Sequence, residues 1–322
     1  MIMGTLLSWV ILLLLYPGTV ELARRKNTSF VQPISAVFLD TRGGMHHNRY
    51  VSKGGVSMTI IDTHAHIYPD KIALKAAKSI GEFYEIDMHL DGTVSSLLKV
   101  GEEAGVSRWL VHSVAVTWER SRSINDFIAS AVEAHPEKFI GYGSIHPDHP
   151  EMEKELDYML SRGLRGVKLH PDFQHFLLDD PQAIRLFAAM AERKLPLLVH
   201  TGDTRYPYSE PERMARALDA VPGLTAICAH LGGWSRWDAA WQVLAGRENV
   251  YVDCSSSLYA LGAEEAANVI RRYGADRVFF GTDYPMWTPQ EEIARFMALP
   301  LTDEEREMIL HRNFERFIGE NE

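Results

Sequence analysis

Short apolar runs alternate along the chain with longer segments whose apolar residues recur at helical spacing. In the segment 151–162, for example, Met152, Leu156 and Met159 fall on one face of a helix. Short apolar runs bounded by turn residues predict strands. The predicted strands are 58–62, 107–114, 138–145, 164–170, 195–200, 224–230, 249–254 and 277–282. The predicted helices include 93–104, 123–135, 151–162, 181–193, 210–220, 236–246 and 263–273.

Strands that alternate with helices are typical of βαβ units and a parallel sheet. Eight such units follow residue 57, which matches a (β/α)8 TIM barrel in number and size. A doubly wound sheet is the alternative α/β architecture, and it usually carries a glycine-rich phosphate turn after its first strand. Here the first strand is followed by THAHIYPD, which contains no glycine. We therefore predict one TIM-barrel domain over residues 58–322.

Residues 1–57 differ from the rest of the chain. The apolar run 6–16 is shorter than the roughly 20 residues of a transmembrane helix. It has the length of a signal-peptide core, but no Lys or Arg precedes it. The remainder, up to residue 57, shows no periodicity and is expected to be loop or disordered. We predict that Met58 is the natural start and that residues 1–57 are translated upstream sequence. An uncleaved anchor or a weak export signal is the alternative.

The composition limits the class of protein. Hydrophobic residues make up 46% and charged residues 24% of the 322 residues, as in an ordinary globular protein. The net charge of -10 disfavours nucleic-acid binding through a basic surface. The two cysteines, Cys228 and Cys254, cannot form a disulfide framework. We expect a cytoplasmic protein that binds a small molecule, and neither nucleic acid nor a membrane.

Polar side chains gather at the carboxyl ends of the predicted strands. The first strand leads into His64 and His66, which lie two residues apart and therefore face the same side. Strands five, six and eight lead into His200, His230 and Asp283. The active site of a TIM barrel lies at this face, and polar groups are costly to bury without a function. Imidazoles and a carboxylate together indicate Zn²⁺ or a similar divalent ion, with open positions for water or substrate.

The motifs IDTHAH, LLVHTGD, CAHLGG and FFGTDYP resemble the signatures of the amidohydrolase superfamily. The chain is most similar to the amidohydrolase-related branch, which includes aminocarboxymuconate-semialdehyde decarboxylase and resorcylate decarboxylases, from residue 58 to about residue 318. The resemblance implies one divalent metal ion, expected to be Zn²⁺, with the ligands His64, His66, His200 and Asp283. It also implies that His230 acts as acid and base or orients the attacking water. Asp283 can bind the metal, take the proton of the water, or do both.

Lys168 lies in the fourth predicted strand, in GVKLHP. In binuclear amidohydrolases a carboxylated lysine on this strand bridges two metal ions. Alternatively, Lys168 binds a substrate carboxylate, pairs with Asp283, or lies outside the site. Because the chain resembles the mononuclear branch more closely, we expect one metal ion. His170 faces the same side as Lys168 and is expected to contact substrate, unless Pro171 turns it away.

The loops that follow the strands are expected to select the substrate. Arg120, Arg205 and Arg236 lie in such loops, and each can hold a carboxylate with its forked guanidinium group. Solvation at the surface is the commoner role of any single arginine. The long first connection, 67–92, provides a segment at 81–92 that can cover the site. His112, inside the second strand, is expected to belong to the core or to support the site.

Three functions are compatible with these residues. The first is a hydrolase in which metal-activated water attacks a C–N, lactone or ester bond of a small molecule while His230 and Asp283 move protons. The second is a non-oxidative decarboxylase with the same metal ligands and an arginine on the substrate carboxylate. The third, a metal-binding or scaffold protein with a degraded site, is disfavoured because the ligand set is complete. We predict the hydrolase, with the decarboxylase as alternative, and the resemblance suggests a homodimer.

Overall fold

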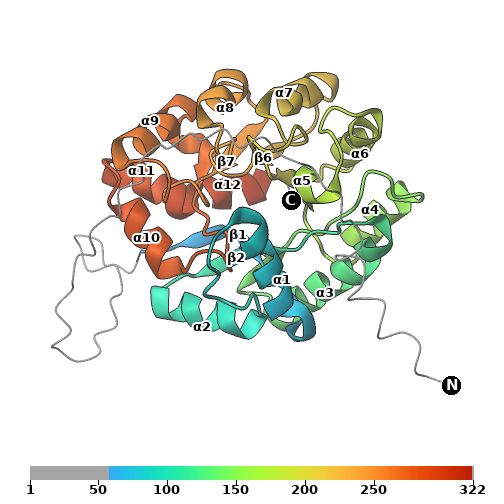
Figure 1. Ribbon diagram of the computed structural model, residues 1–322, viewed down its shortest axis with the longest axis horizontal. Coiled ribbons are helices and arrows are strands. Elements are labelled where there is room, and N and C mark those ends of the chain that lie inside the picture. The colour runs from blue at the N-terminus through green and yellow to red at the C-terminus, as the bar shows by residue number, and fades with distance from the viewer. Residues whose placement is uncertain (1–57, 321–322) are drawn as a thin grey trace, which may run out of the picture. The chain divides into compact units, whose positions relative to one another are not determined.

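The computed structural model describes residues 58–320, and these form a ring of parallel strands surrounded by helices (Figure 1). Strands β1–β3 form one sheet and β4–β8 a second. Parallel bridges between Gly143 and Val167 and between Ala65 and Tyr284 join the sheets at both junctions. The TIM barrel predicted from the sequence is therefore confirmed. The strands are β1 (Ile61–His66), β2 (Arg108–His112), β3 (Phe139–Gly141), β4 (Val167–Leu169), β5 (Leu197–Val199), β6 (Ala226–Cys228), β7 (Val250–Asp253) and β8 (Val278–Phe279).

The helices lie outside the strands, and each of the seven predicted helices is present within two residues of its expected bounds. The helices are α1 (Asp70–Tyr84), α2 (Val94–Ala104), α3 (Ser121–Ala134), α4 (Met152–Ser161), α5 (Pro171–Gln174), α6 (Pro181–Glu192), α7 (Pro211–Ala220), α8 (Trp237–Leu244), α9 (Ala263–Tyr273), α10 (Pro289–Met297), α11 (Asp303–Glu307) and α12 (Asn313–Glu320). Short 3₁₀ or π turns are η1 (Trp118–Arg120), η2 (Ala275–Arg277) and η3 (Met308–Arg312).

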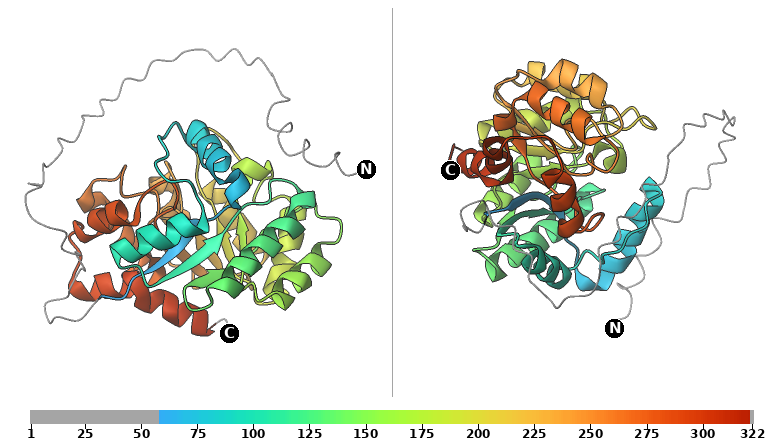
Figure 2. Two further views of the ribbon diagram at one scale, coloured as in Figure 1. Left: turned by 90° about the horizontal axis from the view of Figure 1, so that it is seen from below. Right: turned by 90° about the vertical axis from the view of Figure 1, so that its left-hand side faces the viewer.

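The connection 67–92, predicted as a loop, contains the 15-residue helix α1 instead. Its buried positions are Ala73, Ala77 and Gly81, whereas Leu74 is 74% exposed. A helix recognised by its large apolar residues would bury leucine rather than alanine and glycine, so the pattern did not reveal α1. Figure 2 shows α1 at one end of the barrel and α12 at the opposite end.

The first strand is longer than predicted and includes both histidines of the His-x-His motif. Its register against β2 shifts between Asp62 and Ala65, which marks a β-bulge. A bulge inserts one residue and re-aims the side chains that follow it. His64 and His66 consequently lie inside a hydrogen-bonded strand, where the backbone restricts the directions of their side chains.

Two apolar layers hold the barrel together. The larger layer fills the space between the strands and the outer helices. The smaller one closes the amino-terminal end of the barrel, where Phe314 and Phe317 of α12 pack beneath Ile61, Leu110 and Phe279 of the strands. The amino-terminal end is thus closed by apolar side chains, and the polar residues at the carboxyl ends of the strands lie on the other side.

The apolar run 6–16 and the whole predicted extension 1–57 fall outside the described residues, so their assignment stays a prediction. Among residues 58–320, no helix has both the length and the apolar character needed to cross a membrane.

A substitution in α2 tests the packing of the outer layer. A Cβ added at Gly101 would lie 2.2 Å from Cζ2 of Trp109, a side chain that is 1% exposed. Alanine favours a helix over glycine by about 1 kcal/mol, but such overpacking costs about 1–3 kcal/mol. We expect Gly101→Ala to lower the free energy of unfolding in urea by up to about 2 kcal/mol. Gly223→Ala is the control, because its added Cβ meets its nearest neighbour, Ala191, at 3.6 Å. Equal urea midpoints for the two variants would contradict this account.

Candidate metal centre and active site

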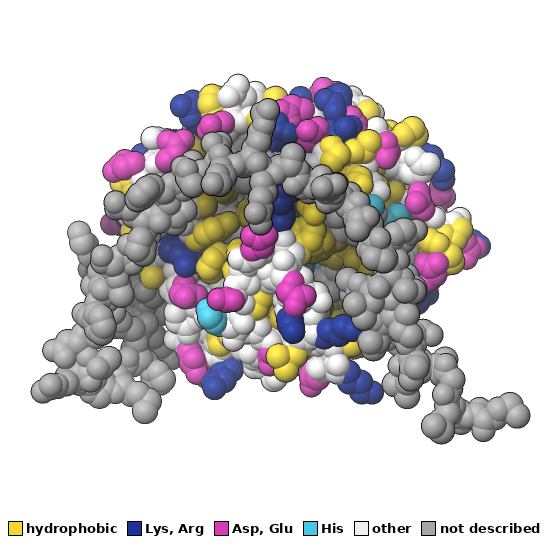
Figure 3. Space-filling view, in the orientation of Figure 1, with side chains coloured by type: hydrophobic (Ala, Val, Ile, Leu, Met, Phe, Trp, Pro, Cys, Tyr) yellow, Lys and Arg dark blue, Asp and Glu magenta, His cyan; other side chains and the backbone are white. Residues whose placement is uncertain are grey.

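Most of the site residues predicted from the sequence converge on one cleft of about 340 Å³, at the carboxyl ends of the strands. Figure 3 shows hydrophobic side chains around a hollow on this face of the molecule. Six predicted site residues are among those that line the cleft, and His64 lies buried directly behind them. The cleft is lined by His66, Ile80, Tyr84, Met88, Lys168, His170, Phe173, His200, His230, Asp283, Pro285 and Met286.

The histidines of β1 and the aspartate after β8 form a group of donor atoms. Nε2 of His64 and Nε2 of His66 each lie 3.4 Å from Oδ1 of Asp283. Two ligands of a tetrahedral cation, with bonds of about 2.1 Å, are separated by about 3.4 Å. The second carboxylate oxygen of Asp283 accepts a 2.6 Å hydrogen bond from Ser256. The spacing of these three donors therefore fits a divalent cation.

Asp253, at the end of β7, fixes the tautomer of His64. Nδ1 of His64 donates a 2.9 Å hydrogen bond to Oδ2 of Asp253, which leaves the lone pair on Nε2. Oδ1 of Asp253 accepts a 3.2 Å bond from the backbone N–H of His230. Metal-binding histidines commonly donate their second nitrogen to a carboxylate in this way. Sequence reasoning missed Asp253, although the strand-end rule that selected His230 applies equally to the end of strand seven.

His200 and His230 form a second group of donors. Nε2 of His200 lies 3.0 Å from the carbonyl oxygen of Gly202, and Nδ1 of His230 lies 3.0 Å from that of Ser255. A carbonyl only accepts hydrogen bonds, so both nitrogens carry protons. In neutral rings, the other nitrogens then face each other with lone pairs at 3.0 Å. A shared proton or cation stabilises that arrangement, since cis ligands with bonds of about 2.1 Å are about 3.0 Å apart.

The backbone around the site is held in an uncommon conformation. His230 and Asp283 have φ angles of 62° and 61°. This left-handed region is costly for residues other than glycine, and such residues cluster at functional sites. The carboxylate of Asp62 accepts 3.0 Å bonds from the backbone N–H groups of His64 and Thr282, and so connects both sides of the donor group.

The comparison with known proteins identifies the family of the chain. The family described as Amidohydrolase matches residues 61–319. The chain belongs to the amidohydrolase family. A search of curated proteins found no match.

Three solved structures share the fold of this family member. An uncharacterised TIM-barrel protein from Bordetella bronchiseptica is 24% identical, with a TM-score of 0.68, over 82% of this chain and 99% of that one. A dihydroxybenzoic acid decarboxylase from Polaromonas, with bound manganese and 2-nitroresorcinol, is 16% identical, with a TM-score of 0.65, over 82% and 98%. A probable 2-pyrone-4,6-dicarboxylic acid hydrolase from Acinetobacter baumannii, with citric acid bound, is 17% identical, with a TM-score of 0.61, over 81% and 100%.

Burial sets the protonation of the site in this amidohydrolase-family protein. Burial lowers the pKa of His66 and of His230 to about 4. Both rings are therefore neutral at pH 7 and have lone pairs available. Burial also lowers the pKa of Lys168 to about 8. Its ammonium group donates a 3.1 Å hydrogen bond to Nε2 of His64, beside the donor group of β1.

His170 faces the cleft, so Pro171 does not turn it away. Its ring stacks on that of His200, at 4.1 Å and 10°, and on that of Phe173, at 3.9 Å and 16°. The hydroxyl oxygen of Tyr84 lies 2.8 Å from Nε2 of His170. This stack of near-parallel rings comes from the end of β4, α5 and the end of β5, and it gives the cleft an aromatic side.

The three candidate arginines lie outside the lining of the cleft in the part of the chain that the structure describes. Arg205 forms a forked pair with Asp203 at 2.8–3.3 Å and donates a 2.6 Å bond to the carbonyl oxygen of Phe83. Arg236 pairs with Glu210 and Glu212. Arg120 ends the turn η1. Their role in binding substrate stays a prediction, and Lys168 is the cation that the cleft itself contains.

Replacing Asp253 by asparagine tests its role in orienting His64. The amide retains the shape of the side chain but removes the charge that favours a proton on Nδ1 of His64. We expect Asp253→Asn to weaken binding of Zn²⁺ by about 10- to 100-fold, measured by competition with a chromophoric chelator. Asp219→Asn is the matched control, since Asp219 is 65% exposed and pairs with Arg247. Circular dichroism verifies folding, and unchanged Zn²⁺ affinity in a folded Asp253→Asn protein would count against the role.

Proposed function

We propose that this chain is a metal-dependent hydrolase of a small organic substrate. The observation that carries the proposal is that one cleft contains both parts of a metal-assisted hydrolytic site. One part is the donor group of His64, His66 and Asp283, with its 3.4 Å spacings. The other is the neutral His230, whose Nε2 faces His200 in the same cleft. Metal-assisted hydrolysis uses a cation and a neutral base near each other.

The residues divide the proposed reaction between them. A bound divalent cation supplies an activated water and polarises the carbonyl oxygen of the substrate. The carboxylate of Asp283, anchored by Ser256, accepts a proton at Oδ1. His230 carries a proton between Nε2 and the leaving group, because the Ser255 carbonyl keeps its Nδ1 protonated. A proton shared between Nε2 of His230 and Nδ1 of His200, which lie 3.0 Å apart, would hold the two rings in place.

We propose a small, planar carboxylic acid as substrate. The aromatic rings of His170 and Phe173 line the cleft, and Lys168 provides a buried positive charge in it. Met88 and Ile80 cover the opposite apolar part. The structural neighbours support this substrate class in part, because one binds a planar aromatic ring, 2-nitroresorcinol, and another binds a carboxylic acid, citric acid.

Decarboxylation is the second candidate function, and the dihydroxybenzoic acid decarboxylase among the neighbours favours it. That reaction calls for a strong anchor on the departing carboxylate, for which a forked arginine is best suited. Here, carboxylates of the chain itself engage Arg205 and Arg236. This difference is the reason for placing hydrolysis first.

The reaction class is tested with protein loaded with Zn²⁺ or Mn²⁺. Panels of lactones, amides, esters and aromatic acids are incubated in ¹⁸O-labelled water. We expect ¹⁸O in a product carboxylate, no release of CO₂, and loss of turnover by at least about 100-fold in His230→Gln, as for a general acid–base residue. Release of CO₂ without incorporation of ¹⁸O would replace the hydrolase by the decarboxylase.

The metal count tests the state of Lys168. We expect one metal ion per chain, with or without bicarbonate, because the ammonium group of Lys168 occupies the position beside His64. Inductively coupled plasma mass spectrometry of wild type and Lys168→Met measures the count. Two ions per chain after loading with bicarbonate, reduced to one in Lys168→Met, would instead indicate a carboxylated bridging lysine.

A further inference from the structure

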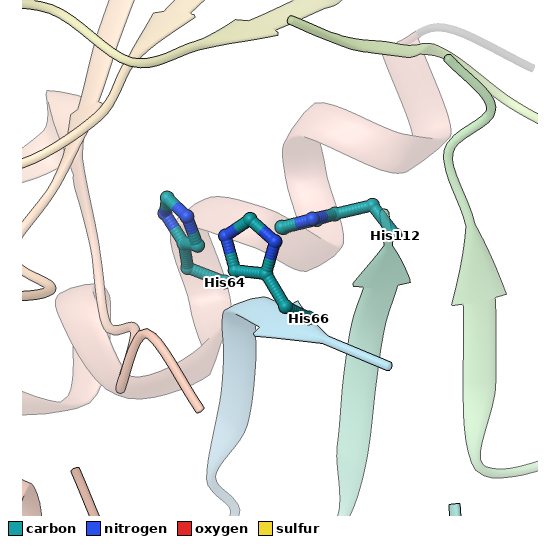
Figure 4. A group of neighbouring side chains, drawn as sticks. All are labelled: His64, His66 and His112. Atoms are coloured by element: carbon teal, nitrogen blue, oxygen red, sulfur yellow. The ribbon is translucent and has the colours of Figure 1, made fainter. Parts of the chain in front are cut away.

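His112 is the last residue of β2, and its Cα pairs with that of His66 across the parallel ladder. Figure 4 shows its ring beside those of His64 and His66, which come from β1. The ring centroid of His112 lies 4.4 Å from that of His66 and 4.9 Å from that of His64, in edge-to-face contacts. One nitrogen of each ring lies within 4.8 Å of the other two. Two neighbouring strands thus bring three imidazoles together.

The polar atoms of His112 have no function in the packing. Its side chain is 0% exposed, and neither ring nitrogen has a hydrogen-bond partner among the described residues. Nδ1 of His66 is also unpartnered. Each buried unsatisfied polar atom costs about 1–3 kcal/mol. Phenylalanine would fill the same space without that cost, so the two ring nitrogens indicate a ligand rather than a packing role.

The charges around the three rings favour a cation as that ligand. Asp253 and Asp283 both contact His64, at 2.9 and 3.4 Å. Lys168 is the only lysine or arginine among the described residues that line the cleft. Two carboxylates beside one ammonium group leave a negative balance in a buried region, where charge must be compensated. A water molecule would satisfy ring nitrogens but would not supply positive charge.

We propose that His112 is a further nitrogen ligand of the divalent cation, next to His64 and His66. The inference rests on the metal centre of the proposed function and adds a residue from β2 to it. Two ligands with bonds of about 2.1 Å can be no more than about 4.2 Å apart. The three ring nitrogens, which lie within 4.8 Å of one another, must still approach by up to about 1.4 Å to reach the roughly 3.4 Å between tetrahedral ligands. Three imidazoles and one carboxylate suit Zn²⁺, Co²⁺ or Mn²⁺.

The test measures cation binding by the metal-free full chain. Wild type, His112→Phe and His112→Ala are titrated with Zn²⁺ against a chromophoric chelator. We expect both substitutions to raise the Kd for Zn²⁺ at least about 10- to 100-fold, the range found for losing even an outer partner of a ligand. His112→Phe should keep or raise the metal-free Tm, because the ring volume is retained and the two unsatisfied nitrogens are removed, but lose most of the Tm increase caused by Zn²⁺. Free imidazole should restore part of the affinity of His112→Ala.

A spectroscopic readout and a control separate ligation from packing. The visible absorption of the Co²⁺-loaded protein should change in His112→Phe, since the number of nitrogen ligands falls. His149→Ala removes a half-buried imidazole that packs against Trp118 and should retain the wild-type Kd. If wild type binds Zn²⁺ and His112→Phe has the same Kd and Co²⁺ spectrum, the inference is wrong and the metal centre stands. If wild type binds no divalent cation, the proposed metal centre fails with it.

Discussion

The contact between β1 and the segment that follows β8 determines the geometry of the site. Oδ1 of Asp62 accepts bonds from the backbone of His64 and Thr282, and Oδ2 accepts a 2.6 Å bond from the hydroxyl of Thr282. Backbone bonds from Asp283 to His64 (2.8 Å) and from His66 to Tyr284 (2.7 Å) lie beside this carboxylate. The contact between β1 and the segment after β8, which closes the barrel, therefore also places the carboxylate of Asp283 opposite the imidazoles of His64 and His66. A shift of one residue in the pairing between β1 and this segment would turn the donor side chains away from one another.

Burial also makes the charged forms of these groups unfavourable unless an opposite charge lies nearby. Burial moves His66, His230 and Lys168 toward their neutral forms, whereas Asp253 is held ionised, with a pKa of about 2, by His64 against the opposing effect of burial. The outer apolar layer and the closed amino-terminal end stabilise the barrel independently of this cluster. Any cation that binds the folded chain alone would add its binding free energy to the stability of the fold.

The sequence predicts the barrel and much of the cleft because the carboxyl ends of parallel strands meet at one face. That rule alone places His66, Lys168 and His230 in one cleft, as found. The apolar pattern did not reveal helix α1, because the face that α1 buries consists of alanine and glycine. The strand-end rule also points to Asp253. This residue was missed because it ends an apolar strand and has no neighbouring histidine in the sequence.

Partners of long side chains depend on tertiary contacts, so the sequence could not reveal what the arginines bind. Arg236 meets Glu210 and Glu212, which lie more than twenty residues before it in the chain. Arg205 instead engages Asp203 and, through the carbonyl oxygen of Phe83, the end of α1. Its guanidinium also lies 4.6 Å from the centre of the Phe83 ring, within the range of cation–π attraction.

Arg205 thus contacts α1, which helps to line the cleft, and its role in binding substrate stays a prediction. Helix α1 and the residues after it contribute Ile80, Tyr84 and Met88 to the lining, whereas the proposed metal donors come from strand ends. The donors are held by the barrel, but α1 is held mainly by side-chain contacts such as Phe83 with Phe173 and Arg205. Chemistry and substrate choice consequently depend on different parts of the fold. A change in the contacts of α1 can alter which flat molecule fits while leaving His64, His66 and Asp283 in place.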